Sequence, residues 1–217
     1  WPAIEAHFSV HADVSAAAIA ESVARVRGGI RGSALAPVDE DVLRYAQAVA
    51  ARREGVPLGG DGIAGEAWLR CAHATLCGHR NAFGAGRIKP IENFVDVSIR
   101  PTRTLPAAAA ATLRVALGTL ASRGPAGGPR AAFLLYTIAH VHAFQDGNGR
   151  LARLVVGAEL ARVGCWPAIL PRRRQRVEEA SVFDEAIRRV DLAPIVDWLA
   201  GQSRLAASVA RGGSAEG

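Results

Sequence analysis

The sequence lacks methionine altogether and contains one lysine, Lys89, against 25 arginines. Cysteine is also scarce, and its three residues show neither the paired spacing of a disulfide framework nor that of a zinc site. We therefore expect three small buried thiols in a reducing compartment, the cytoplasm. No apolar run approaches the roughly 20 residues that cross a membrane, so we expect no membrane partner.

The composition that is present indicates a folded chain. Half of the 217 residues are apolar and 21% are charged, which is too apolar for a disordered protein and enough for a substantial core. The net charge of +6 would suit a nucleic acid or phosphate partner. Because the arginines are spread along the chain, we do not expect a nucleic-acid partner; a helical nucleic-acid-binding protein is the alternative that the charge alone supports.

Glycine and proline divide the chain into blocks in which apolar residues recur at helical spacing. We predict helices over Val14–Val26, Asp39–Arg53, Ile63–Arg80, Pro106–Leu120, Ala131–Ala143, Leu151–Val163, Phe183–Val190 and Leu192–Val209. Residues that favour strands lie only between Phe83 and Ile99 and predict one small β-hairpin. The predicted fold class is therefore all-α: a helical bundle with one hairpin.

One stretch, from His142 to Arg153, combines groups that suit phosphate chemistry. Its glycines, Gly147 and Gly149, allow a tight turn that exposes main-chain N–H groups at the start of the following helix, where the helix dipole favours anions. Arg150 lies three residues before Arg153, so both guanidinium groups share one face of that helix and can bind phosphate oxygens.

Two further side chains in this stretch complete a reactive set. Asp146 offers a hard oxygen ligand for Mg²⁺, and His142 has an ordinary pKa near neutrality, so it can accept a proton from an attacking hydroxyl. The sequence has no G-x-x-x-x-G-K-[ST] motif, which excludes a P-loop. A base, a metal ligand, an anion-binding turn and two guanidinium groups together predict phosphoryl or nucleotidyl transfer.

The stretch resembles the signature of the Fic family, H-x-F-x-[DE]-G-N-G-R-x-x-R, at all eight specified positions. The apolar helix before it and the helix after it agree, and the resemblance covers roughly residues 20 to 205. It implies that His142 is the general base for a target hydroxyl, that Asp146 binds Mg²⁺ at the α- and β-phosphates of ATP, and that Phe144 packs into the core.

The resemblance also assigns the phosphate contacts. It makes the glycine-rich turn the anion hole, and it places the β-phosphate on the first signature arginine and the γ-phosphate, or the inhibitory glutamate where one exists, on the second. The residues that this implies are Gly147, Asn148, Gly149, Arg150 and Arg153.

A flap hairpin that docks the target by main-chain pairing is implied at Arg87, Ile88, Lys89, Pro90 and Ile91. Pro90 has no N–H group and fits poorly into a pairing strand, which weakens the case for a peptide target. The alternative is that Pro90 lies on the edge that does not pair.

Many Fic proteins inhibit themselves through a [ST]-x-x-x-E-[GN] helix whose glutamate pairs with the second signature arginine. No segment here matches that pattern, and its positional counterpart is Arg27–Gly32, with Arg31 in the place of the glutamate. We hypothesise that glutamate-mediated inhibition is absent, because an arginine cannot pair with Arg153. The alternative is that Arg31 is merely solvated beside a glycine turn.

These patterns predict a Fic-type nucleotidyltransferase that moves AMP from ATP, with Mg²⁺ as cofactor, to a hydroxyl of a target protein. One alternative is a repurposed Fic enzyme with a small-molecule acceptor or another phosphate donor, such as another NTP or a CDP-linked group. The other is a non-catalytic nucleotide-binding or toxin–antitoxin module. We expect residues 1–60 to form an N-terminal helical region, 61–210 the Fic core and 211–217 a flexible tail, in a chain that could form a homodimer.

Overall fold

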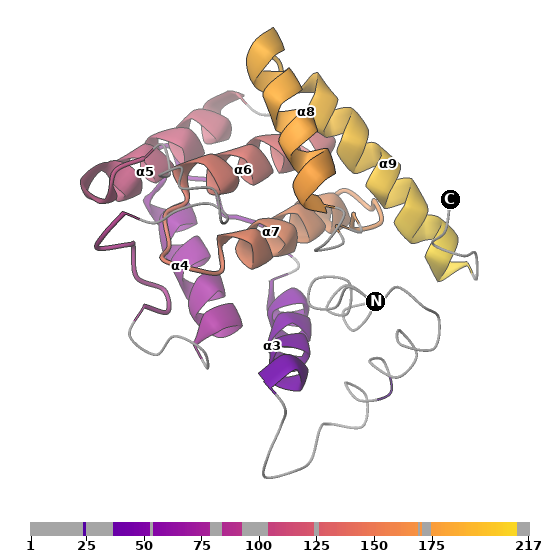
Figure 1. The fold of residues 1–217 in the computed structure, drawn as a ribbon, viewed down its shortest axis with the longest axis horizontal. Coiled ribbons are helices and arrows are strands. Elements are labelled where there is room, and N and C mark those ends of the chain that lie inside the picture. Colours follow the sequence, from indigo (N-terminus) through magenta and orange to yellow (C-terminus); the bar gives the residue numbers. More distant parts are fainter. Residues whose placement is uncertain are drawn as a thin grey trace.

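The computed structural model describes residue 24 and residues 37–52, 54–78, 84–92, 104–123, 126–168, 170 and 175–211. All regular secondary structure in these ranges is helical (Figure 1), which confirms the predicted all-α class. The helices are α3 (Pro37–Ala51), α4 (Ile63–Cys77), α5 (Pro106–Arg123), α6 (Gly128–Val141), α7 (Asn148–Arg162), α8 (Gln175–Arg189) and α9 (Ala193–Ala210).

Most helix boundaries lie within a few residues of the predicted ones, but α8 does not. It begins at Gln175, well before the predicted start at Phe183, because the polar first half of this helix carries little apolar periodicity. The predicted helix over Val14–Val26 lies outside the described residues except for Ala24. Of the predicted hairpin, the structure describes residues 84–92, which form turns and irregular backbone; residues 93–103 lie outside the description.

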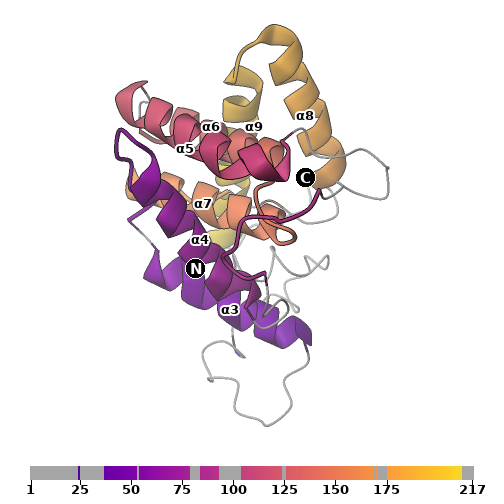
Figure 2. The same ribbon diagram turned by 90° about the vertical axis from the view of Figure 1, so that its left-hand side faces the viewer.

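Helix α7 lies at the centre of the bundle (Figures 1 and 2). Every residue from Leu151 to Leu160 is buried, because this helix is covered on all sides and is apolar around most of its circumference. It packs against α6, α4 and α3. Helix α7 is therefore held in place by three other helices.

The remaining helices cover the two sides of this centre. Helix α4 turns Leu69, Ala72 and Leu76 inward, at the spacing of one helix face. Helix α6 packs against α5 and α9, and α8 lies beside α9 at the opposite end of the molecule from α3 (Figures 1 and 2). Helix α3 contributes Tyr45 to the same core, and the predicted domain division at residue 60 remains a prediction.

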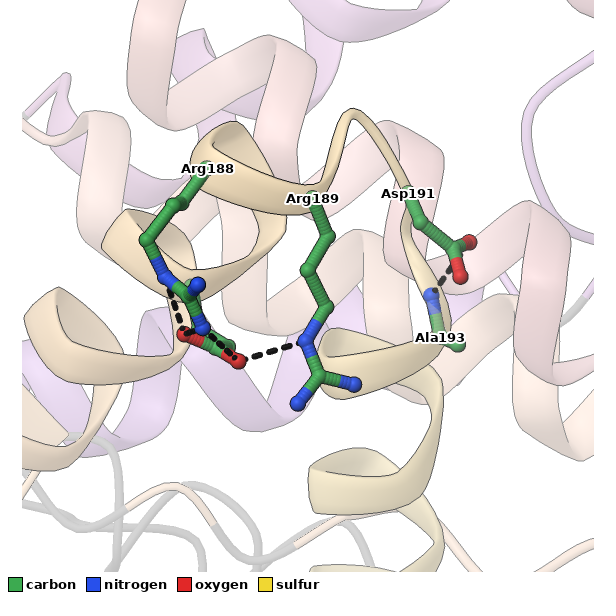
Figure 3. Close-up of polar contacts among 5 residues, drawn as sticks. Arg188, Arg189, Asp191 and Ala193 are labelled. Carbon is green, nitrogen blue, oxygen red and sulfur yellow. Dashed lines mark hydrogen bonds and ion pairs between the residues drawn. The ribbon is translucent and has the colours of Figure 1, made fainter.

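The end of α8 is held by local polar contacts (Figure 3). Arg188 and Arg189 both bind Glu185, one turn earlier, with Nε of Arg188 2.9 Å from a carboxylate oxygen. After the turn, the Asp191 carboxylate accepts a hydrogen bond of 3.0 Å from the N–H of Ala193. These contacts end one helix and begin the next at the protein surface.

The prediction of three buried thiols is wrong for two of them. All three cysteines are free, but only Cys77 is buried, whereas Cys71 and Cys165 are exposed. Cys71 lies on the outer face of α4, where Nη2 of Arg52 approaches its sulfur to 3.1 Å. In the described part of the chain, no helix combines the length and the apolar character that crossing a membrane requires.

Candidate active site

The turn between α6 and α7 carries the candidate base and the candidate anion site. His142 ends α6 in the left-handed conformation (φ 47°, ψ 52°), and its N–H bonds to the carbonyl of Ile138 at 3.0 Å. Non-glycine residues avoid this conformation, so the surrounding structure must hold it. Helix α7 then starts from Gly147 (φ 80°), whose carbonyl accepts the N–H of Leu151 at 3.0 Å.

Asn148 closes this turn from within. Its Oδ1 accepts the N–H of Phe144 at 3.1 Å, and its Nδ2 donates to the carbonyl of the same residue at 2.7 Å. The side chain is buried and engaged on both sides, so it shapes the turn. At the start of α7, the main-chain N–H groups before Leu151 have no acceptor within the helix.

A histidine of α4 supports the same turn. His73 is fully buried, and its ring stacks on Phe144 with centroids 4.1 Å apart and planes 8° from parallel. Its Nε2 lies 2.7 Å from the carbonyl oxygen of Asp146, and its Nδ1 accepts the N–H of Gly86 at 2.9 Å. The sequence patterns did not single out this residue, although a histidine between Ala72 and Leu76 on the inward face of a helix is a signal.

The glycine of the turn lies directly on α4. A Cβ atom added to Gly147 would come within 2.4 Å of the Cys77 sulfur and 3.0 Å of Nε2 of His73. The backbone therefore approaches α4 more closely than any side chain would allow. Through this contact the turn lies directly against α4, a helix that is about 70 residues earlier in the sequence.

The two signature arginines lie on the first turns of α7 in different surroundings. Nη1 of Arg150 is 3.7 Å from Oδ1 of Asp41 on α3 and 3.8 Å from the Cys77 sulfur. Arg153 is largely buried, and its Nη1 would lie 3.7 Å from a Cβ added to Gly149. Arg150 and Arg153 thus both lie next to the glycine-rich start of α7, and the Asp41 carboxylate of α3 lies close to Arg150.

The environment of His142 favours the neutral imidazole. Burial is the main cause that lowers the pKa of His142 below its ordinary value of 6.5, and the positive charge of Lys89 lowers it further. A hydrogen bond to the Ala139 carbonyl and the charge of Asp146 oppose this effect. A neutral imidazole is the form that can accept a proton.

The flap segment, residues 84–92, is attached to the site at two points. The N–H of Lys89 donates to the carbonyl of Ala143 at 2.8 Å, next to the candidate base, and the Lys89 side chain is only 2% exposed. Gly86 is held by α4: Nε of Arg70 donates to its carbonyl at 2.8 Å, while its N–H bonds to His73.

Outside these attachments, the flap residues differ in exposure. Ile88 packs against the core, whereas Arg87, Pro90 and Ile91 are exposed. The structure thus brings the flap beside the signature turn. The other predicted position, Arg31, lies outside the described residues.

The described residues contain no group of three or more histidine, cysteine, aspartate or glutamate side chains that could form a protein cage for a metal ion. Asp146 alone offers a carboxylate at the turn; the residue is exposed, and its Oδ1 accepts the N–H of Gly147 at 2.6 Å. A single carboxylate suits Mg²⁺, which usually keeps several waters and binds substrate phosphates. The donor set therefore fits a magnesium ion delivered with a nucleotide.

Residues 66–160 match the model of the Fic/DOC family. A stretch of 70 residues is 34% identical to "Protein adenylyltransferase Fic" of Drosophila persimilis, and the same holds for the Drosophila melanogaster protein. That stretch is 32% of this chain and only 13% and 14% of those two proteins. The match confirms the family resemblance that the signature predicts.

Solved structures of Fic-domain proteins share the fold. Fic-1 from C. elegans superposes with a TM-score of 0.67 at 24% identity, over 95% of this chain and 61% of that one. A Fic-domain-containing signaling protein from Bacteroides thetaiotaomicron gives a TM-score of 0.69 at 15% identity, over 100% and 88% of the two chains. At these identities the likeness establishes the arrangement of helices.

Proposed function

We propose that this chain, whose residues 66–160 match the Fic/DOC family, transfers AMP from Mg-ATP to a hydroxyl group of a protein. One observation carries the proposal: a single turn joins His142, whose pKa is lowered mainly by burial, at the end of α6 to a glycine-rich helix start flanked by Arg150 and Arg153. The relatives called protein adenylyltransferase support the same reaction.

In this proposal, His142 accepts the proton of the attacking hydroxyl. The hydroxyl oxygen bonds to the α-phosphorus, the bond between the α-phosphorus and the bridging oxygen breaks, and pyrophosphate leaves with the bonding electron pair. The lowered pKa of His142 supports the role, because the base must be neutral when the substrate arrives. The hydrogen bond from the main-chain N–H of His142 to the Ile138 carbonyl fixes the backbone position from which the imidazole ring projects.

The start of α7 would bind the leaving phosphates. The main-chain N–H groups of its first turn and the helix dipole favour negative charge, and Arg150 and Arg153 add two guanidinium groups. Asp146 would hold Mg²⁺, which when bound neutralises charge on the phosphates. Because α4, through His73 and Cys77, supports this turn, its donors are in place before the nucleotide binds.

The flap supports a second candidate acceptor, a small molecule. The N–H of Lys89 is already bound to Ala143, and Pro90 has none, so two consecutive flap residues offer no main-chain donor to a peptide segment. A peptide acceptor would have to pair elsewhere on the flap, whereas a small molecule needs no such pairing.

The test is a labelling experiment with ATP carrying ³²P at either the α or the γ position. We expect α-label, and no γ-label, in a protein band when the chain is incubated with Mg²⁺ and cell lysate. His142→Ala should reduce this labelling at least about 100-fold. His140→Ala, which removes a ring that stacks on Tyr136, is the matched control and should retain labelling.

The other outcomes discriminate among the alternatives. Label from the α position only in small molecules of a metabolite extract would support the second candidate. Transfer of the γ-label would contradict AMP transfer. If no donor, including GTP, UTP and CTP, gave a product that depended on His142, the chain would not be a transferase.

A further inference from the structure

His73 joins two parts of the site that are separate in the sequence. Its Nδ1 accepts a hydrogen bond from the N–H of Gly86 in the flap, and its Nε2 lies at 2.7 Å from the carbonyl of Asp146 in the turn. The ring is fully buried, so no water competes for either contact. A single imidazole therefore spans the gap between the flap and the turn.

The two partners determine the state of this ring. An amide N–H can only donate and a carbonyl can only accept, so Nδ1 must carry a lone pair and Nε2 must carry the hydrogen. Either the other neutral tautomer or a doubly protonated ring would place an N–H against the N–H of Gly86. The ring thus has one form that satisfies both contacts.

Close packing around the His73 ring fixes the distance between the Gly86 N–H and the Asp146 carbonyl. One face of the ring stacks on Phe144, and Gly147 packs so closely that an added Cβ would lie 3.0 Å from Nε2. On the flap side, an added Cβ on Gly86 would meet the Arg70 carbonyl oxygen at 2.8 Å, and Arg70 also binds the Gly86 carbonyl. Neither partner can shift without losing close packing on α4.

We propose that His73 is a positioning residue that sets the distance between the flap and the magnesium- and phosphate-binding turn, and so aligns the acceptor with Mg-ATP. This role rests on the proposed function, because the alignment matters only if both substrates bind there. His73 touches neither substrate in this role; it acts through the Gly86 and Asp146 backbones.

Two substitutions separate the contacts. In His73→Asn, the amide oxygen can replace Nδ1 and accept from Gly86, but nothing reaches Asp146. In His73→Gln, the longer side chain can place an amide N–H near the Nε2 position, while the acceptor for Gly86 is lost. Each variant therefore keeps one end of the span and removes the other. His140→Gln is the matched control, since its ring stacks on Tyr136.

We expect reciprocal effects. His73→Asn should weaken binding of Mg²⁺ with a non-hydrolysable ATP analogue about 10- to 100-fold in calorimetry, as loss of support for a metal ligand does. His73→Gln should bind the analogue within about twofold of wild type and instead raise the KM for the acceptor about 10-fold. His140→Gln should change neither quantity.

Two measurements do not depend on turnover. The calorimetric titration needs no transfer, and ¹⁵N NMR of the wild-type ring reports which nitrogen carries the hydrogen. We expect an unprotonated Nδ1 and a protonated Nε2. Absence of AMP transfer by the wild type, with the expected tautomer and analogue binding, would contradict the proposed function and leave the span intact.

The positioning role has its own contrary outcomes. A hydrogen on Nδ1 would overturn it. Equal loss of analogue binding in both variants, accompanied by equal loss of thermal stability, would show that His73 is only a packing residue. Unchanged binding and KM in both variants would also overturn it.

Discussion

Gly147 has no room for a side chain, and it therefore provides a sharp test at the scale of a residue. Gly147→Ala would place a Cβ 2.4 Å from the Cys77 sulfur while φ stays at 80°. We expect the free energy of unfolding to fall by about 2 kcal/mol or more, from overpacking and left-handed strain together, with loss of ATP binding. Denaturant titration and calorimetry measure the two effects.

Gly149 is the matched control for that change. It lies two residues later in the same helix start, and an added Cβ would meet Nη1 of Arg153 at an ordinary contact distance of 3.7 Å. Gly149→Ala should leave the stability nearly unchanged. Equal destabilisation by both alanines would contradict the steric argument for Gly147.

His142 and Lys89 give a prediction about pH. A base must be neutral, so kcat/KM should fall as pH drops through the pKa of His142 in the free enzyme. Since burial and the charge of Lys89 both lower that pKa, the acid limb should lie below pH 6.5. Lys89→Met removes one of the two causes, and the limb should then move to higher pH in a pH–rate profile.

The control for this shift is the neighbouring exposed cation of the flap. Arg87→Gln removes a positive charge from the same segment, but this side chain is exposed and solvent screens it. The acid limb should stay in place in that variant. A limb that stayed in place, or moved to lower pH, in Lys89→Met would contradict an effect of the lysine charge on His142.

At the scale of elements, α7 and α8 end in the same way with different residues. In α8, the N–H of Val190 bonds to Ile187 and that of Asp191 to Ala186, which is the hydrogen-bond pattern of a Schellman motif. In α7, Gly164 occupies the equivalent left-handed position (φ 76°). Glycine is usual there, whereas Val190 adopts φ 53° with a branched side chain.

Val190→Gly should therefore stabilise the protein. The side chain is 94% exposed, so little packing is lost, and relief of left-handed strain should raise the free energy of unfolding by about 1 kcal/mol. The converse change, Gly164→Val, should lower it, although nothing lies within 4 Å of the added Cβ. Thermal unfolding of both variants tests the pair; a destabilised Val190→Gly would refute it.

For the whole molecule, Glu159 connects three segments in the interior. It is fully buried in α7, its Oε1 accepts the N–H of Val56 at 2.8 Å, and its Oε2 lies 2.8 Å from Nε of Arg130 on α6. Arg130 in turn donates to the Val56 carbonyl at 2.7 Å. Arg162 adds a second cation at 3.4 Å. The segment between α3 and α4 is tied to the central helices through this carboxylate.

Glu159→Ala should lower the free energy of unfolding by about 3–5 kcal/mol, because it leaves Arg130 as an unpaired, nearly buried charge. Urea unfolding measures the loss. The control is Glu185→Ala, which removes a carboxylate that is 30% exposed and pairs with the arginines labelled in Figure 3, and it should leave the midpoint almost unchanged. Similar losses in the two variants would contradict the importance of burial.

Sequence patterns sufficed for several features of this molecule. Apolar periodicity identified the helices α3 to α7 and α9 within a few residues, because a helix that packs on a core must repeat at 3.6 residues. It failed for the start of α8, where charged residues hide the period. The contiguous stretch from His142 to Arg153 was equally visible, since its groups are local in the chain.

The local sequence thus determined that a candidate base, an acidic side chain and a glycine-rich helix start would follow one another around Gly147. Only the tertiary structure decided what surrounds them: His73 beneath the turn, Asp41 beside Arg150, and Lys89 near the base. The physical reason is distance along the chain. Backbone geometry within a turn depends on adjacent residues, whereas contacts from α3, α4 and the flap depend on how separate helices pack.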